Sequence, residues 1–350
     1  MKILHVAPMN VAGVPYNMMD MQRRFGHEAR LVTLHINDLT FPEDICLKLP
    51  LFRNPIAQAW RSIKAANTGP EPRTMASRNV LERLFFSADD WRRGDRVIAA
   101  IEQYKLDDFP IVHYDGGLDF FRDARIAKRW KAEGKKIVCH YMGSDLRLRG
   151  VHPVLNELSD LNLTNESDHL HLHPDIHYLY IPFDASTFQV RTSENQRLRI
   201  LHSPSKRSMK GTLLILPVIE KLKRVRDVDF VLVENTPHTE LLRIKQQCDI
   251  AIEQIGNMGG TGYGRNSLEN LALGIPTVTE MTEDYSAWLP DNPFILADAT
   301  TLLDRLVDLI DSPELRQQKR IHGRQWVEDY HSYESVYARL MSLYKDHGIT

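Results

Sequence analysis

Short apolar segments alternate with helical segments along this chain, and the alternation restarts halfway. The predicted strands of the first half are Lys2–Ala7, Glu28–Leu34, Ile111–Tyr114, Lys136–Tyr141, Leu161–Thr164 and His177–Ile181. Those of the second half are Leu198–His202, Phe230–Glu234, Asp249–Gln254, Thr277–Thr279 and Phe294–Leu296. Because strand–helix–strand repeats form parallel sheets covered by helices, we predict two α/β domains of the Rossmann-like kind.

The 350-residue length also favours two domains. We expect an N-terminal domain over residues 1–185 and a C-terminal domain over residues 196–331, joined by the polar, aperiodic hinge Pro182–Gln196. Between the second and third predicted strands, the proline-rich segment Phe41–Ser77 has little periodicity. Long segments of this kind are often functional, and acceptor binding would suit this one.

The composition limits the class of protein. A formal net charge of −2 disfavours a general nucleic-acid binder. Three widely spaced cysteines have no zinc-binding spacing and suit a reducing cytoplasm. The first residues are typical of a strand rather than a signal peptide, and no apolar run is long enough to span a bilayer. We expect a cytoplasmic protein. The basic stretch 122–149, with nine Lys/Arg against three Asp/Glu, leaves peripheral contact with the inner membrane face open.

A glycine-rich turn between residues 256 and 264 precedes a predicted helix that begins near Arg265 and ends at Gly274. Its five glycines let backbone N–H groups approach a ligand, and the helix N-terminus favours a phosphate. Glu269 lies one turn into the helix and can reach the same ligand. This arrangement predicts a nucleotide-sugar site, although tight packing alone also requires glycines.

A basic turn follows the first strand of the second half. Lys206, Arg207 and Lys210 could neutralise a diphosphate there, and Gly211 permits close backbone approach. The simpler alternative is a solvated turn. Its position at the carboxyl end of a strand, where α/β sheets bind ligands, favours phosphate binding.

The motifs Gly262-Tyr263-Gly264 and Glu269–Pro276 resemble the donor-binding motif of glycosyltransferase family 4. This resemblance implies the GT-B fold, with two Rossmann-like domains facing each other across a cleft, and it implies retaining sugar transfer. Lys210 matches the lysine that holds the donor diphosphate in that family. The chain departs from the pattern at Thr261, where the family has a glutamate that contacts the sugar, and at Pro204, where it has an arginine.

The resemblance implies a role for each matching residue on the donor side. Glu269 holds the nucleotide ribose, while Lys210 and Arg207, the latter in place of the missing arginine, hold the diphosphate. The loop of Thr261, Gly262, Tyr263 and Gly264 offers N–H groups to phosphate and sugar. Glu234 approaches the nucleotide base.

On the acceptor side the resemblance implies that Gly13 lies near the donor phosphate and that His113 lies near the reacting centre. Asp145 would line the acceptor pocket, unless it only pairs with Arg147. A tight turn at Gly13 and a hydrogen-bonding role for His113 are the simpler alternatives. The helix within 332–350 would pack back on the first domain.

The function implied is transfer of a sugar from a nucleotide-diphosphate sugar to an acceptor hydroxyl, with retention and with neither metal nor cofactor. The acceptor would be a saccharide, a glycolipid or a small molecule. A catalytically degenerate GT-B subunit that binds a sugar or a partner protein remains an alternative, as do an epimerase, a phosphorylase and inverting transfer. His169, His171, His173 and His177 have a spacing that a metal could use on one strand face, but a surface turn is the preferred interpretation.

Overall fold

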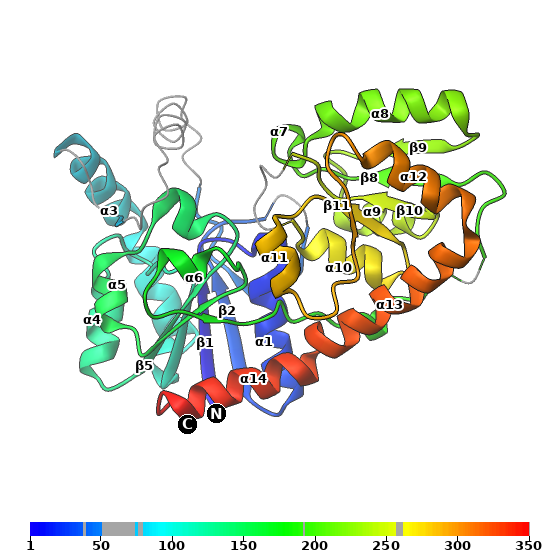
Figure 1. Ribbon diagram of the computed structural model, residues 1–350. Helices are drawn as coiled ribbons and strands as arrows, with labels where there is room; N and C mark the ends of the chain where they lie inside the picture. Colours follow the sequence, from blue (N-terminus) through cyan, green and yellow to red (C-terminus); the bar gives the residue numbers. More distant parts are fainter. Residues whose placement is uncertain (38–39, 51–73, 76–79, 192, 257–261, 350) are drawn as a thin grey trace. The chain divides into compact units, whose positions relative to one another are not determined.

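The computed structural model describes residues 1–37, 40–50, 74–75, 80–191, 193–256 and 262–349. The chain divides into two compact units (Figure 1). The first unit consists of Met1–Pro182 together with Tyr337–Thr350, and the second unit consists of Phe183–Val336. The chain therefore passes from one unit to the other twice.

The first unit contains a parallel sheet in the order β3-β2-β1-β4-β5-β6-β7. Its strands are β1 (Lys2–Ala7), β2 (Glu28–Thr33), β3 (Ile45–Cys46), β4 (Ile111–Asp115), β5 (Lys136–Tyr141), β6 (Leu161–Thr164) and β7 (His177–Tyr178). Strands β2 and β3 lie on one side of β1, and strands β4 to β7 lie on its other side. The order thus reverses between β1 and β4, which is where sheets of this type bind ligands.

The helices of the first unit follow from the same alternation. They are α1 (Val14–Arg24), α3 (Val80–Gln103), α4 (Arg125–Ala132), α5 (Pro153–Leu158), α6 (His169–Leu172) and α14 (Tyr333–Asp346), whose part from Tyr337 onward belongs to this unit. The largest apolar cluster lies against one face of the sheet, with Leu4, Val112 and Tyr114 from the strands and Trp130 from α4. Figure 1 shows α14 (red) running past the start of β1 (blue).

A polar cluster occupies the other face of this sheet. His5 pairs in register with His113, and Asp115 pairs in register with His140, so the four side chains point to the same side. All four are fully buried. His5 Nδ1 lies 2.9 Å from Asp115 Oδ2, and His113 Nε2 hydrogen-bonds the hydroxyl group of Tyr344 on α14. The C-terminal helix therefore covers the centre of the first sheet.

The second unit contains a parallel sheet in the order β12-β11-β10-β8-β9. Its strands are β8 (Arg199–His202), β9 (Asp229–Leu232), β10 (Ile250–Ile252), β11 (Thr277–Thr279) and β12 (Ile295–Leu296). Its helices are α7 (Arg207–Lys210), α8 (Thr212–Val225), α9 (His238–Lys245), α10 (Arg265–Ala272), α11 (Glu283–Trp288), α12 (Leu302–Asp311) and α13 (Pro313–His331). The order reverses between β8 and β10, which defines the place in this unit where a ligand is expected.

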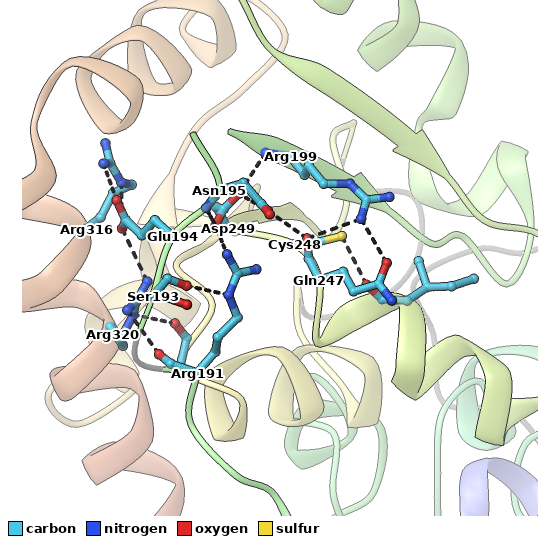
Figure 2. A network of polar contacts seen from close by, with 12 residues as sticks. Arg191, Ser193, Glu194, Asn195, Arg199, Gln247, Cys248, Asp249, Arg316 and Arg320 are labelled. Carbon is cyan, nitrogen blue, oxygen red and sulfur yellow. Dashed lines mark hydrogen bonds and ion pairs between the residues drawn. The ribbon is translucent and has the colours of Figure 1, made fainter. Parts of the chain in front are cut away.

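The segment expected as a hinge is fixed to the second unit from Phe183 onward. Glu194 accepts hydrogen bonds from Arg316 Nε, at 2.9 Å, and from Arg320 Nη2, at 3.2 Å (Figure 2). The buried carboxylate of Asp249 accepts from the backbone and side-chain nitrogens of Asn195 at 3.1 and 2.8 Å. These bonds hold the segment against α13 and against the start of β10.

The predicted alternation and the two parallel sheets are confirmed. The structure differs at three elements of note: the strand expected over His177–Ile181 ends at Tyr178, and neither β3 nor the ten-residue helix α12 was predicted. Most of the proline-rich segment Phe41–Ser77 lies outside the described residues. Every helix within the described part of the chain is too short or too polar to cross a membrane.

Candidate functional site

The candidate site lies at the carboxyl ends of β8 and β10, where the order of the second sheet reverses. His202, the last residue of β8, is fully buried and fixes this edge. Its Nδ1 lies 2.9 Å from the carbonyl oxygen of Ile252 on β10, and its Nε2 lies 2.9 Å from Oγ1 of Thr212 on α8. These bonds fix the ends of β8 and β10, from which the two loops of the site begin.

Gly211 joins these two loops. It has a φ of +65°, in the left-handed region, and a Cβ added there would lie 1.6 Å from the carbonyl oxygen of Ile255. The Ile255 N–H also donates to the carbonyl oxygen of Lys210 at 3.3 Å. Only glycine allows this contact between the two backbones, which places the side chain of Lys210 over the end of β10.

Lys210 contacts a buried carboxylate at that point. Its Nζ lies 2.5 Å from Glu253 Oε1 and 3.2 Å from Gln254 Oε1, and Asn266 Nδ2 donates to Glu253 Oε2 at 2.7 Å. Burial acts to raise the pKa of Glu253, but the Lys210 ammonium and these hydrogen bonds outweigh it, so the pKa lies below its ordinary value. The Lys210 side chain retains 16% exposure. The lysine is thus held in place by a carboxylate while part of it faces solvent.

Glu269 lies in α10, beside this pair, and is almost completely buried. Its Oε1 accepts from His238 Nε2 at 2.7 Å and from Arg265 Nε at 3.0 Å, and its Oε2 accepts from Lys245 Nζ at 2.8 Å. Burial acts to raise the pKa of Glu269, but the Lys245 ammonium and the other donors hold it well below its usual range. A carboxylate oxygen accepts about two hydrogen bonds, so Oε2 retains capacity for one more donor.

Arg207 and Glu234 pair with each other at the surface of the same edge. The guanidinium donates from Nε at 2.8 Å and from Nη2 at 2.5 Å to the two oxygens of Glu234. This bidentate pair lowers the pKa of Glu234, chiefly through the hydrogen bonds from Arg207. Both residues therefore lie at the candidate site, where they form an ion pair with each other.

Tyr263 belongs to an aromatic cluster. Its ring stacks on Tyr285 and packs edge-on against Trp326, and it is 9% exposed. Gly262 has a φ of +106°, and a Cβ there would lie 2.8 Å from the carbonyl oxygen of Glu280. Gly264 is the extended residue before α10. The described part of the predicted glycine loop thus has a packing role, and Thr261 lies outside the described residues.

Two of the residues predicted on the acceptor side, Gly13 and Asp145, lie at the carboxyl edge of the first sheet. Gly13 is the left-handed residue that precedes α1, with a φ of +70°. Asp145, just after β5, accepts from the Met142 N–H at 3.0 Å and pairs with Arg149 at 3.0 Å. Burial raises the pKa of Asp145 even though Arg149 acts in the opposite direction. The alternative pairing of Asp145 with Arg147 is wrong, because Arg147 pairs with Asp168 and Glu166.

His113 is the third of five residues in β4 rather than a strand-end residue, and it has no exposed surface. Burial lowers its pKa well below the usual range, so the ring is neutral beneath Tyr344. The buried position of His113 does not support its predicted place near the reacting centre.

Two groups among the described residues bring potential metal ligands within 4.8 Å of one another. They are His5 with His113 and Asp115, and Asp175 with His177 and His347. The strand-face spacing considered for His169, His171 and His173 is wrong, because His169–Leu172 forms the helix α6.

Sequence reasoning missed three residues that contact Lys210 or Glu269: Glu253, Lys245 and His238. Glu253 directly follows a buried strand, a position that could have marked it. Lys245 is fully buried although it lies in a helix rich in polar residues. Its ammonium donates to Glu269 Oε2 and to the carbonyl oxygen of Asn266, both more than 20 residues further along the chain, and these two bonds account for that burial.

No family model matches the chain, and no curated protein matches its sequence. Similar solved structures nevertheless span its whole length. An alpha-glucosyltransferase in complex with UDP and a 13-mer DNA is 11% identical, with 98% of this chain and 99% of that chain covered and a TM-score of 0.62. Anabaena HepE in complex with UDP-glucose is 10% identical, with coverage of 99% and 100% and a TM-score of 0.59. The N-terminal domain of Candida albicans trehalose-6-phosphate phosphatase is 12% identical, with coverage of 99% and 97% and a TM-score of 0.66. The chain therefore has the GT-B fold.

Proposed function

We propose that this chain is a glycosyltransferase that moves a sugar from a nucleotide-diphosphate sugar to an acceptor hydroxyl with retention of configuration. The observation that carries the proposal is the grouping of Lys210, Arg207 and Glu269 where the order of the second sheet reverses. Structures of similar fold that contain UDP or UDP-glucose support it.

The diphosphate would bind between the basic turn and the start of α10. Lys210 is positioned by Glu253, and a diphosphate could share its ammonium, which has three donors. Arg207 would turn from Glu234 toward the phosphate, since both side chains of that pair reach solvent. The N-terminal end of α10 adds partial positive charge. These groups would stabilise the negative charge that develops on the leaving diphosphate.

Glu269 would hold the ribose. His238, Lys245 and Arg265 fix the carboxylate in one orientation before any ligand arrives. The remaining acceptor capacity of Oε2 suits a single hydroxyl donor. A preorganised acceptor of this kind binds a hydroxyl without the entropy cost of ordering a mobile side chain.

The transfer itself would proceed on one face of the sugar. The bond between the anomeric carbon and the diphosphate breaks as the acceptor oxygen attacks from the same side, and the acceptor proton passes to the leaving phosphate oxygen. Neither a metal nor a cofactor enters this proposal, because Lys210 and Arg207 supply the positive charge. We propose that Gly13 and Asp145 orient the acceptor side.

The test is calorimetric titration with UDP-, GDP-, TDP- and ADP-sugars, followed by measurement of diphosphate release. A charge-assisted hydrogen bond contributes about 1.5–3 kcal/mol, so Lys210→Met should weaken binding by roughly 10- to 150-fold. Lys223→Met is the matched control, since Lys223 lies on α8 in the same unit and is 41% exposed.

The outcomes separate the proposal from its main alternative. Selective binding of one nucleotide sugar, with diphosphate release that Lys210→Met abolishes and Lys223→Met preserves, supports a transferase. Binding without release, in the presence of a range of sugar acceptors, would identify a degenerate subunit. If no nucleotide sugar binds, the site assignment is wrong.

A further inference from the structure

The end of the C-terminal helix meets the last strand of the first sheet at a group of three side chains. His347 directly follows α14, His177 is the first residue of β7, and Asp175 lies two residues before it. One potential ligand atom from each of the three lies within 4.8 Å of the other two. The rings of His177 and His347 pack edge-on, with their centroids 4.9 Å apart. All three residues belong to the first unit, and we call them the His–His–Asp group.

Backbone hydrogen bonds fix the strand side of this group. His177 lies opposite Leu163 in the parallel pairing of β7 with β6. Just before the strand, Asn162 Nδ2 donates to the carbonyl oxygen of Asp175 at 3.1 Å. The N–H of Asp175 donates to His173 Nδ1, also at 3.1 Å. The fold therefore sets the positions from which the carboxylate and the first imidazole extend.

Both imidazole rings are in a state that suits a metal ligand. His347 Nδ1 lies 2.8 Å from the carbonyl oxygen of Leu343. A carbonyl oxygen only accepts, so Nδ1 carries the proton and Nε2 of the neutral ring has a lone pair. Metal-binding histidines commonly donate their second ring nitrogen to a carbonyl in this way. His177 Nε2 is buried and has no hydrogen-bond partner within the described residues. Burial and the neighbouring His347 lower the pKa of His177, which keeps its ring in the neutral form that a metal requires.

Two imidazoles and a carboxylate are ligands that zinc prefers. Zinc bonds nitrogen and carboxylate oxygen at about 2.0–2.2 Å, so a tetrahedral ion holds its ligands roughly 3.3–3.6 Å apart. His177 Nε2 lies 3.8 Å from Asp175 Oδ1. The Asp175 side chain is 76% exposed, so a small rotation about its own bonds brings the carboxylate within reach of a shared ion.

We infer that Asp175, His177 and His347 bind a zinc ion, which fastens the end of α14 to the edge strand of the first sheet. Water completes the four ligands. The whole second unit lies between His177 and His347 in the sequence, so the ion secures the return of the chain to the first unit. This role is structural and goes beyond the proposed function, since no step of the sugar transfer uses the ion.

The experiment titrates zinc into the full chain after metal ions have been removed with EDTA. Calorimetry gives the affinity and the stoichiometry, and hydrogen–deuterium exchange locates the stabilised backbone. The site variants are His177→Gln and His347→Gln. The matched control is His322→Gln, because His322 lies 3.1 Å from Asp291 and is 28% exposed, much as His177 lies beside Asp175. That pair belongs to no group of three potential ligands in the part of the chain that the structure describes. Thermal melting without zinc checks that every variant is folded.

We expect wild type and control to bind one zinc ion with the same affinity, and each site variant to bind it at least tenfold more weakly. Zinc at 100 times its dissociation constant should raise the melting temperature of wild type by about 5–10 °C. It should also slow exchange in the segments 175–179 and 343–349. The inference is overturned if wild type binds no zinc, or if the site variants bind it as tightly as wild type does. Zinc binding that leaves exchange in both segments unchanged would overturn it too, because the ion would then not fasten the helix.

Nucleotide-sugar affinity, measured in the same proteins, separates this inference from the proposed function. It should be the same with zinc, with EDTA and in His347→Gln, because the residues proposed for the donor belong to the second unit. If nucleotide sugars bind and zinc does not, only the zinc inference fails. If zinc binds as expected and no nucleotide sugar binds, only the proposed function fails. An affinity for nucleotide sugars that depends on zinc would contradict the structural role given to the ion.

Discussion

Replacement of Gly211 by alanine tests whether contact between two backbones, at Gly211 and Ile255, holds the Lys210–Glu253 pair in place. The substitution introduces two separate costs. A left-handed φ of +65° costs a residue with a Cβ about 1–2 kcal/mol. The new Cβ also lies 1.6 Å from the Ile255 carbonyl oxygen, so one of the two loops has to move. Overpacking of this kind costs roughly 1–3 kcal/mol.

The expected loss in free energy of unfolding is therefore about 2–5 kcal/mol for Gly211→Ala. At about 2–4 °C per kcal/mol for a unit of this size, the melting temperature of the second unit should fall by roughly 4–20 °C. Gly26→Ala is the matched control, because Gly26 has a φ of +81° and no atom within 4 Å of the added Cβ. It should lose only the conformational part, about 1–2 kcal/mol.

Urea denaturation gives the overall stabilities, and hydrogen–deuterium exchange locates the change. Exchange in Gly211→Ala should rise in the segments 203–212 and 250–256 and remain as in wild type in the first unit. The reasoning is refuted if the two alanine variants lose the same free energy, or if the extra exchange appears elsewhere.

Three further predictions concern buried polar groups. Glu269→Gln should cost about 3–5 kcal/mol because it leaves the ammonium of Lys245 buried without a counter-charge. Because folding lowers the pKa of Glu269, its carboxylate stabilises the folded protein fully above the unfolded-state pKa of about 4.3, and this contribution declines as the pH falls below that value. The difference in free energy of unfolding between wild type and Glu269→Gln, measured by urea denaturation, should therefore be smaller at pH 3 than at pH 7. Tyr344→Phe should cost about 1–3 kcal/mol by leaving His113 without its hydrogen-bond partner, and an unchanged denaturation midpoint would contradict this. Burial raises the pKa of Cys139 to about 12, so a thiol reagent at pH 8 should label it only after unfolding, as peptide mass spectrometry can determine.

The larger elements could be predicted because their patterns are local. The strands Lys2–Ala7 and Lys136–Tyr141 match the structure to the residue, since strands buried on both faces are continuous apolar runs. The two-residue strand Ile45–Cys46 offers too short a pattern to recognise. The amphipathic helix Leu302–Asp311 had a usable pattern and was not assigned.

The chemistry of individual side chains was harder to predict. His113 was expected at a reacting centre, but its environment is set by Tyr344, which is 231 residues away in the sequence. Tyr263 lies in a motif typical of donor sites, yet distant aromatic residues surround it. Lys210 and Glu269 lie at the expected edge of the sheet, because the carboxyl ends of parallel strands follow directly from strand order. Of their buried partners, Glu253 directly follows a strand and could have been noticed, whereas Lys245 lies in a separate helix and has no local signature.

The return of α14 to the first unit has a consequence for synthesis on the ribosome. When Pro182 emerges, the first sheet still lacks the helix that covers His113, because Tyr344 of that helix is made 231 residues after His113. At about 5–20 residues per second, the second half of the chain takes roughly 10–30 s to follow. During that interval the nascent first unit exposes a face that is buried in the finished protein, so it depends on delayed closure or on chaperone cover.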